Sequence, residues 1–510
     1  MIYFALLATT AIIFLSFFRK YRTSKNLPLP PGPKGWPLIG NLLDMPSQSE
    51  WITYHKWSKE LGTDILYLNV AGTRIIVLDT IEAATDLLEK RSVIYSGRTR
   101  LIMCNELMGW DFAFGFMNYG ETWRHRRRIV SEQFNTVAVQ QFYPKLLTAT
   151  RGLLKDMLQN SNDVIGNLRH LAADTIFSVV YGLDVKMEGR ESLEAAKEAN
   201  HAMLIAGIPG RFLVDYIPLL RFVPEWVPGA KFQKLARGWK EATLKMIEMP
   251  FLTSKAKVDD GTAATSVLAH SIAKMQEGAN PAIFTHENIK AATGTIFTAG
   301  SDTTVSCLAS CILALVHNPH VVAKAQKELD GALSVGQLPD FSDEDSLPYI
   351  TAIVKETLRW RDVAPIAIPH RLDADDVYRG YHLPKGSMVI GNSWAILHDE
   401  KIYPDPFKFN PDRFIKDGKF DKSVPDPELS CFGFGRRICP GRHLAYSAVW
   451  IAVASLLTVF DIKKVADKDG RIIEPGEEYD SALVCTPLPF PCSITPRSEK
   501  WSAIIRGDSD

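Results

Sequence analysis

The segment that decides the fold reads Phe432-Gly433-Phe434-Gly435-Arg436-Arg437-Ile438-Cys439-Pro440-Gly441. Its spaced glycines let the backbone turn tightly and approach a ligand closely. Pro440 suits the first turn of a helix, and the apolar periodicity of residues 441–457 predicts that helix. We therefore expect Cys439 at a helix N-terminus beside two arginines, where the pKa of a thiol is lowered. Such a thiolate can be a nucleophile, a redox thiol or an axial metal ligand.

This segment leaves other assignments open. Its glycines resemble the start of a dinucleotide-binding loop, but Ile438 stands where the third glycine belongs. Cys431, Cys439 and His443 could bind zinc, although their spacing follows no common zinc module. The Cys-x-x-Cys-His pattern of c-type haem attachment is absent. We expect the other cysteines to be small buried hydrophobic residues: Cys104, Cys307, Cys311, Cys431, Cys485 and Cys492.

The composition excludes several classes of protein. The chain has 510 residues, 46% hydrophobic and 23% charged, which are globular values. Lys+Arg and Asp+Glu both number 58, so no global positive charge drives nucleic-acid binding. Seven irregularly spaced cysteines and the absence of an Asn-x-Ser/Thr sequon argue against a soluble secreted protein.

The N-terminus carries a candidate membrane anchor at residues 1–20. Residues 2–18 are apolar apart from two threonines and a serine, and a basic cluster follows directly. The run is just long enough to span a bilayer, and its positive flank predicts that the remainder is cytoplasmic. A surface-lying or cleaved segment is the alternative. The basic, proline-rich residues 21–44 predict a stiff, extended hinge, and 45–510 read as one continuous body.

Within that body, periodicity predicts a mainly α fold with a minor β part. Two β-rich runs, 64–70 and 74–79, are joined by Ala71-Gly72, which indicates a hairpin. Short β-like pieces return near 368–390 and 482–495. We expect helices near 82–91, 121–135, 137–160, 164–181, 190–206, 230–250, 286–317, 319–333, 346–361 and 440–458.

The chain resembles the cytochrome P450 family, specifically its microsomal fungal members. Phe432-x-x-Gly435-x-Arg437-x-Cys439-x-Gly441 matches that family's haem-binding loop at every defining position. The resemblance implies a cytochrome P450 fold, preceded by one N-terminal transmembrane helix, with 45–510 as the catalytic domain. It also implies that haem b is the cofactor and that Cys439 is the axial thiolate ligand of its iron.

Two further matches imply a structural cluster near that loop. Glu356-Thr357-Leu358-Arg359 looks like the family's Glu-x-x-Arg helix, although such an ion pair is common on any helix. Phe409-Asn410-Pro411-Asp412-Arg413-Phe414 resembles the segment whose arginine joins the pair. The resemblance therefore implies a Glu356–Arg359–Arg413 cluster.

A third match, Ala299-Gly300-Ser301-Asp302-Thr303-Thr304, lies in the middle of a long apolar helix. A glycine inside a helix costs about 1 kcal/mol relative to alanine, so Gly300 needs a reason. The resemblance implies that the helix crosses the distal face of haem and opens at Gly300 to admit dioxygen and water. It also implies that Thr303 donates to bound dioxygen and that Asp302 relays protons from solvent. An aspartate on a solvated face is the simpler alternative.

Haem propionates need cationic or N–H donors. The resemblance implies Arg437, Trp123, Arg127 and His370, with Phe432 also in the cofactor site. The basic run 124–128 could bind nucleic acid, but a docking face for an acidic electron-transfer protein fits a neutral chain better. Because no flavin or nicotinamide loop is present, the implied partner is NADPH–cytochrome P450 reductase, with cytochrome b5 as a further candidate, at the endoplasmic reticulum membrane.

The resemblance places the substrate pocket at residues 101–117, 201–213, 296–303, 363–368 and 481–485. These segments are largely apolar, and they include Phe112, Phe114, Phe116, Phe297, Ile366 and Ile368. We therefore expect a monooxygenase that hydroxylates a small terpenoid, polyketide or indole-type amine in fungal secondary metabolism. Glu106 or Asp111 could bind an amine, although loop acids are usually solvated.

Three alternatives remain. The chain could be a P450 that catalyses rearrangement or oxidative coupling, a non-catalytic haem protein, or, less consistently with the motifs, a zinc-dependent structural protein. For the apolar segment 208–227, buried loop packing and a second membrane contact remain equally open.

Overall fold

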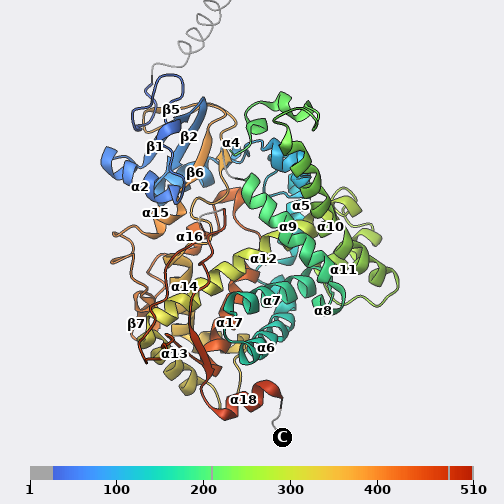
Figure 1. The fold of residues 1–510 in the computed structure, drawn as a ribbon, viewed down its shortest axis with the longest axis vertical. Coiled ribbons are helices and arrows are strands. Elements are labelled where there is room, and N and C mark those ends of the chain that lie inside the picture. The colour runs from blue at the N-terminus through green and yellow to red at the C-terminus, as the bar shows by residue number, and fades with distance from the viewer. Residues whose placement is uncertain (1–26, 208–210, 481–482, 508–510) are drawn as a thin grey trace, which may run out of the picture.

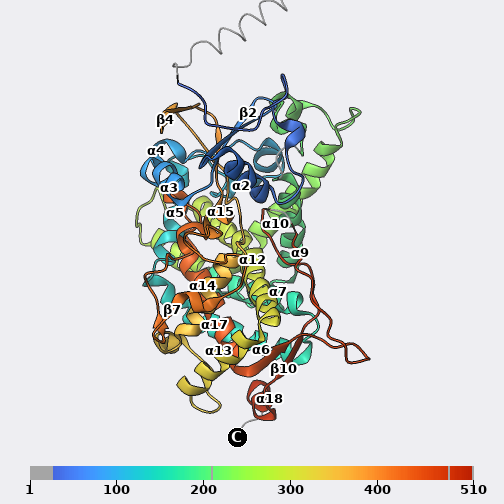
Figure 2. The same cartoon turned by 90° about the vertical axis from the view of Figure 1, so that its left-hand side faces the viewer.

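The computed structural model describes residues 27–207, 211–480 and 483–507 (Figure 1). Strands β1 (Ile65–Val70), β2 (Thr73–Leu78) and β6 (Met388–Gly391) lie at one end of the molecule, and most helices lie beyond them. Strand β10 (Ser493–Pro496) lies near α18 (Glu499–Arg506) at the opposite end, as the view turned by 90° also shows (Figure 2). The anchor predicted at 1–20 lies outside the described residues. Of the described helices, α12 (His286–His317) and α17 (Arg442–Val459) are long and apolar enough to cross a membrane, but both are mostly buried inside the body.

The predicted hairpin is confirmed. Strand β1 (Ile65–Val70) pairs antiparallel with β2 (Thr73–Leu78), and both turn residues, Ala71 and Gly72, have positive φ. The four-stranded sheet has the order β1-β2-β6-β3, where β6 (Met388–Gly391) is parallel to β2 and β3 (His370–Arg371) is antiparallel to β6. The other strands pair as hairpins or ribbons: β4 (Asp376–Tyr378) with β5 (Tyr381–Leu383), β7 (Ile415–Lys416) with β8 (Lys419–Phe420), and β9 (Phe460–Lys463) with β10 (Ser493–Pro496).

The described part of the expected hinge lies against this sheet region. The carbonyl oxygen of Pro31 accepts a hydrogen bond from Tyr67 N, and that of Pro28 accepts one from His382 N. Gly40 forms a bridge with Val70. Residues 28–40 therefore pack along the body instead of standing away from it as a free spacer.

Most predicted helices are present, and seven of the described α-helices were not predicted. The α-helices besides α12 and α17 are α2 (Glu50–Leu61), α3 (Ile81–Ala84), α4 (Ser92–Tyr95), α5 (Glu121–Gln133), α6 (Tyr143–Gln159), α7 (Val164–Ile176), α8 (Val185–Glu188), α9 (Arg190–Ala206), α10 (Lys231–Asp259), α11 (Val267–Gln276), α13 (Pro319–Ala332), α14 (Pro348–Trp360), α15 (Ser393–Leu397), α16 (Glu428–Cys431) and α18 (Glu499–Arg506). The expected ranges contain none of α2, α4, α8, α11, α15, α16 and α18, and α10 continues past Pro250.

Short tighter or wider helical turns complete the fold: η1 (Leu42–Asp44), η2 (Thr85–Lys90), η3 (Ile102–Leu107), η4 (Trp110–Phe112), η5 (Ala138–Phe142), η6 (Phe177–Tyr181), η7 (Leu213–Asp215), η8 (Pro218–Phe222), η9 (Phe341–Ser346), η10 (Pro411–Phe414) and η11 (Gly435–Arg437). At the centre, α12 packs against α5, α7, α14 and α17. Because this helix is apolar on nearly every side, it is covered from all directions and forms the axis of the core.

The implied ion cluster forms and is completely buried. Arg359 makes two hydrogen bonds to the Glu356 carboxylate, of 2.7 and 2.8 Å, and both side chains have no exposed surface. Arg413 Nε donates to the same carboxylate, at 3.1 Å to Oε2. The Arg359 guanidinium also donates to the carbonyl oxygens of Leu397 and Pro406. The cluster therefore ties α14 to the chain that leads toward the haem-loop motif.

Replacing Arg359 by methionine should leave the buried Glu356 carboxylate with Arg413 as its remaining guanidinium partner. We expect the free energy of unfolding to fall by about 3–5 kcal/mol, the usual cost of breaking a buried pair. Thermal unfolding followed by circular dichroism measures the effect. Arg506→Met, which removes an exposed pair with Glu499, is the matched control and should change stability by less than about 0.5 kcal/mol. Equal melting temperatures for the two variants would contradict the assignment.

Candidate active site

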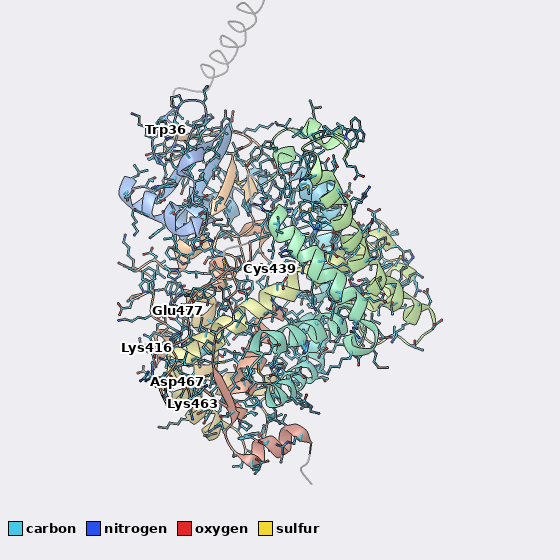
Figure 3. All side chains as sticks on the ribbon, viewed as in Figure 1. Trp36, Lys416, Cys439, Lys463, Asp467 and Glu477 are labelled. Atoms are coloured by element: carbon cyan, nitrogen blue, oxygen red, sulfur yellow. The ribbon has the colours of Figure 1, made fainter. Side chains whose placement is uncertain are left out.

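The loop before α17 presents Cys439 to a cavity inside the molecule (Figure 3). Cys439 N donates to Phe432 O at 2.8 Å, which closes the loop. Gly435 has a φ of 53°, and a Cβ there would lie 2.2 Å from Leu88 O, so only glycine fits against η2. Helix α17 begins at Arg442, three residues beyond Cys439.

The expectation of a lowered thiol pKa is not met, because burial dominates. Burial raises the pKa of Cys439 above its ordinary value, while the Gly441 N–H and the guanidinium groups of Arg127 and Arg442 act in the opposite direction. The arginines adjacent in sequence favour the thiolate, but desolvation of the buried thiol outweighs them. A thiolate that is shielded from water is stable when a metal cation binds it directly.

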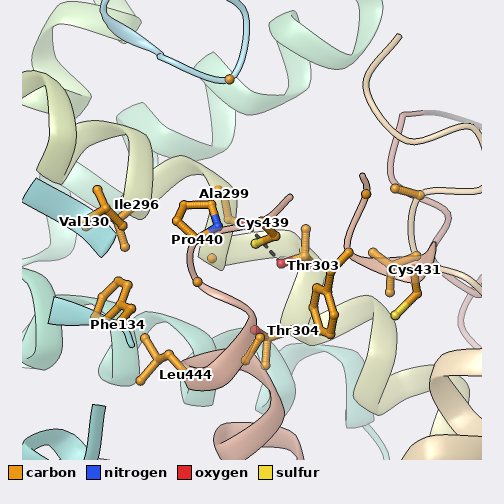
Figure 4. A pocket seen from close by; sticks show the side chains of 18 of the residues that line it. Val130, Phe134, Ile296, Ala299, Thr303, Thr304, Cys431, Cys439, Pro440 and Leu444 are labelled. Carbon is orange, nitrogen blue, oxygen red and sulfur yellow. Dashed lines mark hydrogen bonds between the residues drawn. The ribbon is translucent and has the colours of Figure 1, made fainter. Parts of the chain in front are cut away.

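Helix α12 contributes Thr295, Ile296, Ala299, Gly300 and Thr303 to the same cavity; Figure 4 shows several of these side chains near Cys439. A Cβ on Gly300 would lie 2.4 Å from Ile176 Cδ1, so the glycine allows α7 to approach closely. The helix runs unbroken from 286 to 317, and Thr303 Oγ1 donates to Ala299 O at 2.8 Å. The opening expected at Gly300 therefore stays a prediction.

Asp302 is not among the described residues that line the cavity. Its carboxylate accepts a hydrogen bond from Asn200 Nδ2, at 3.2 Å, which comes from α9. Burial raises the pKa of Asp302, and the positive charge of Arg169 and the Asn200 bond lower it less. The residue is thus a largely buried acid, which argues against the simple solvated aspartate.

Three guanidinium groups converge on the cavity: those of Arg98, Arg127 and Arg437. Arg437 donates to the carbonyl oxygens of Ser96 and Met117, and Arg98 donates to those of Gly115 and Ile368. Within the described chain, none of the three forms an ion pair with a carboxylate. The sequence analysis missed Arg98, because nothing in its local sequence distinguishes it from Arg100 two residues later.

The charges of these arginines are not neutralised by the protein. Burial, together with the charge of the neighbouring Arg127, lowers the pKa of Arg437 to about 10. Burial and repulsion from Arg437 and Arg127 likewise hold the pKa of Arg98 well below its ordinary range. Asp362 also lines the cavity but forms no ion pair with these three guanidinium groups. A cavity that holds three guanidinium groups without carboxylate partners is suited to an anionic ligand, and two carboxylates such as haem propionates match it.

Trp123 and His370 complete this side of the cavity. The Arg437 guanidinium lies 4.5 Å from the centroid of the Trp123 ring, a cation–π distance. His370 Nδ1 lies 2.7 Å from Tyr95 O, so the ring donates there as the neutral tautomer. Burial and the Arg98 charge keep the pKa of His370 far below its ordinary value, which agrees with a neutral ring.

The basic run 124–128 does not form a single surface. Arg126 is buried and donates to Phe112 O, and Arg127 faces the cavity. Arg124 and Arg128 remain exposed, and Arg436 from the haem-loop motif is exposed as well. Because the guanidinium groups of Arg124 and Arg436 both lie over the Tyr119 ring, these two cations form one basic patch, defined here as Arg124 and Arg436. Arg128 instead donates to Glu132 Oε1 at 2.7 Å.

The implied substrate-lining segments are confirmed only in part. Phe114, Gly115, Val363, Ala364, Ala367 and Ile368 line the cavity with the α12 residues. Phe297 instead packs edge-on against Phe177, with ring centroids 5.2 Å apart, because it points to the α7 side of α12. Phe112, Phe116 and Ile366 also lie outside the lining. Residues 208–210 and 481–482 lie outside the described chain.

Neither amine-binding candidate faces the cavity. Glu106 accepts from Arg100 Nε at 2.6 Å and from Arg221 Nη1 at 2.5 Å, so its charge is already paired. Asp111 is exposed to solvent. The zinc alternative gains no support, because the described residues contain no group of three or more His, Cys, Asp or Glu side chains that could hold a metal ion.

Comparisons with known proteins agree with this geometry. Residues 30–492 match the family described as Cytochrome P450. The chain is 47% identical to cytochrome P450 monooxygenase 98 of Postia placenta, over 95% of this chain and 93% of that protein. It is 42% identical to tryptamine 4-monooxygenase of Psilocybe cyanescens, over 98% and 99% of the two chains.

The fold also matches a solved structure. A zebrafish cytochrome P450 determined with abiraterone superposes with a TM-score of 0.70 over 88% of this chain and all of that one, at 23% identity. That identity supports the fold alone. With the family match, the fungal relatives and the Cys439 loop now in place, the chain belongs to the cytochrome P450 family and is a monooxygenase, an oxidoreductase.

Proposed function

We propose that this chain is a haem-thiolate monooxygenase that hydroxylates a small apolar or aromatic metabolite in fungal secondary metabolism. It would consume dioxygen and two electrons from NADPH for each hydroxyl group inserted. The observation that carries the proposal is the cavity where the buried Cys439 thiol meets three guanidinium groups that have no carboxylate partner.

The residues of the cavity fit haem. Cys439 would bind the iron, and Phe432 would pack in the loop that presents it. The propionates would be bound by five side chains: Arg98, Arg127, Arg437, Trp123 and His370. When bound, haem supplies the one-electron and dioxygen chemistry that side chains cannot perform.

Proton delivery would fall to α12. Thr303 lines the cavity with a hydroxyl that now bonds to Ala299 O, and rotation of that hydroxyl would offer a proton to dioxygen. Asp302 directly precedes Thr303 in sequence. On the other side of the helix it accepts a hydrogen bond from Asn200 and interacts with the charge of Arg169. It would take protons from solvent and pass them to Thr303. Gly300 would keep this part of α12 free of side-chain bulk on the α7 side.

The substrate would be apolar or aromatic, because the distal lining is mainly aliphatic and aromatic. Hydrocarbon side chains such as Ile296 and Ile368 exclude water and orient a ligand by shape. One relative is named for its action on tryptamine, which supports an indole-type amine as one member of this substrate class. Terpenoids and polyketides belong to the same class by their polarity.

Electrons would come from NADPH–cytochrome P450 reductase, with cytochrome b5 as a second donor. The basic patch of Arg124 and Arg436 offers an acidic protein a docking surface. Arg436 belongs to the same loop as Cys439, so a partner bound there would lie close to the thiolate side of the cavity.

The protein would be attached to the endoplasmic reticulum membrane through residues 1–20, with 21–44 as the connecting segment and 45–510 as the cytosolic catalytic domain. Leu38 is 91% exposed, and Trp36 lies at the end where the N-terminal segment enters (Figure 3). The segment that contains Leu219, Phe222 and Trp226, exposed by 74%, 69% and 80%, lies at the same end (Figure 1). Exposed apolar side chains in both segments favour the membrane-contact alternative.

Thiolate ligation predicts a strongly red-shifted Soret band in the ferrous–CO difference spectrum of the holoenzyme. Cys439→Ser should lose this band, because a serine hydroxyl is a poor ligand that donates far less charge. Cys431→Ser is the matched control, since Cys431 lines the same cavity eight residues earlier and should leave the band in place. A band that survived in Cys439→Ser would exclude this cysteine as the ligand.

The propionate role predicts that Arg98→Leu lowers the haem bound per protein several-fold, because an anion would lose a buried cation. Arg100→Leu removes an exposed arginine two residues away and should leave haem content unchanged. The pyridine haemochrome assay measures the ratio, and circular dichroism checks that both variants are folded. A full haem complement in Arg98→Leu would remove Arg98 from the cofactor site.

Proton relay predicts that Asp302→Asn and Thr303→Ala slow product formation, by as much as about 100-fold, and divert electrons to hydrogen peroxide. The measurement is peroxide released per NADPH oxidised, with reductase present and tryptamine as the probe. Ser301→Ala removes a neighbouring hydroxyl that bonds to Phe297 O and should behave as wild type. Unchanged coupling in both Asp302→Asn and Thr303→Ala would refute the assigned roles.

A further inference from the structure

Asp302 is held by a residue that is distant in sequence. Asn200 Nδ2 donates to Asp302 Oδ2 at 3.2 Å, and 102 positions separate the two residues. Asn200 lies in α9, is only 7% exposed, and its Oδ1 accepts no hydrogen bond from the described residues. A buried carboxamide oxygen without a donor is costly unless water or a second state of its neighbour supplies one.

The groups that face Asp302 come from two elements. Arg169 from α7 acts on it through its charge, and Asn200 from α9 acts through the hydrogen bond; both favour the carboxylate, whereas burial favours the neutral acid. A carboxamide can serve both states, because its N–H₂ donates to a carboxylate and its oxygen accepts from a protonated carboxyl group after rotation about the last bond. A side chain with only a donor or only an acceptor could serve one state.

We propose that Asn200 is a positioning residue for the acid Asp302, holding its carboxyl group in one orientation while the group gains and loses protons. The inference rests on the relay under Proposed function, since it concerns the same acid. Asn200 itself neither gives nor takes a proton. Its carboxamide donates to Asp302 after the proton has left for Thr303, and it accepts from Asp302 once solvent has restored the proton.

The test uses the holoenzyme with reductase and measures peroxide released per NADPH oxidised, without added organic substrate, from pH 6 to 9. Asn200→Leu keeps the side-chain size and removes both polar atoms. We expect it to raise the peroxide fraction to about the level of Asp302→Asn. Because the lost donor had favoured the carboxylate, the midpoint of the pH profile should also move upward, by about one pH unit or more.

Three comparisons make the result specific. Asn200→Gln retains a carboxamide and should restore most of the wild-type ratio. Asn392→Leu breaks another buried amide-to-carboxylate bond, to Asp79 at 2.9 Å, and should lower stability without changing the ratio. In the Asp302→Asn background, Asn200→Leu should add nothing, because the group it positions is gone. If Asn200→Leu lacks the red-shifted CO band, Asn200→Ala, which also removes both polar atoms, replaces it in the same series.

Wild-type coupling in Asn200→Leu, or an additive effect in the double variant, would overturn the proposal while leaving the relay intact if Asp302→Asn alone still releases more peroxide. Wild-type coupling in Asp302→Asn itself would instead remove the relay and this inference together. The two failures are therefore distinguishable.

Discussion

The rest of the structure depends on the buried ion pair between Glu356 and Arg359. Neither side chain has any exposed surface, and removing two charges from water is tolerable only when nearly every donor and acceptor is matched. The guanidinium meets this condition by donating to Glu356 and to carbonyl oxygens of residues 397, 406 and 408, and Arg413 adds a further bond to the carboxylate. One pair therefore holds several non-helical segments against α14, and these segments precede the loop that presents Cys439.

The cavity, in contrast, contains guanidinium groups that have no carboxylate partner. Whereas Glu356 and Arg359 neutralise each other, Arg98, Arg127 and Arg437 come together without a carboxylate ion-pair partner. Arg127 lowers the pKa of both Arg98 and Arg437, and Arg437 lowers that of Arg98. A protein tolerates such repulsion when a ligand supplies the missing negative charge. The buried thiol of Cys439 is likewise unfavourable as a free thiolate and favourable as a metal ligand. Both features describe a site that is completed by a group carrying a cation at its centre and carboxylates at its edge.

Helix α12 connects this site to the outer helices. Its cavity side carries Thr303, and its other side carries Asp302, which meets Asn200 from α9. Gly300 lets α7 pack closely through Ile176 at the same level. The same turn of helix thus borders the cavity, the core and a polar contact with α9. A change in the position of α9 would therefore alter the hydrogen bond between Asn200 and Asp302.

Local patterns were sufficient for much of the fold. The hairpin at 64–79 followed from alternation and a glycine turn, and long amphipathic or apolar helices followed from their period. Helices α2, α11 and α18 were missed because, with 12, 10 and 8 residues, they are too short to show a clear period, and packing against distant segments stabilises them. For the site, the motif spacing was enough to identify the family and Cys439, Asp302 and Thr303 as candidates.

By itself, the sequence determined the family, the main helices and the identity of the metal-binding candidate, because these depend on spacing along the chain. Only the tertiary structure decided that Arg98 lines the cavity, that Arg126 is buried, and that Phe297 packs against Phe177. It also decided the sign of the thiol pKa shift at Cys439 and the contact of Asn200 with Asp302. The physical reason is that desolvation and long-range hydrogen bonds depend on which distant segments surround a side chain, and that surrounding is not encoded in its neighbours in sequence.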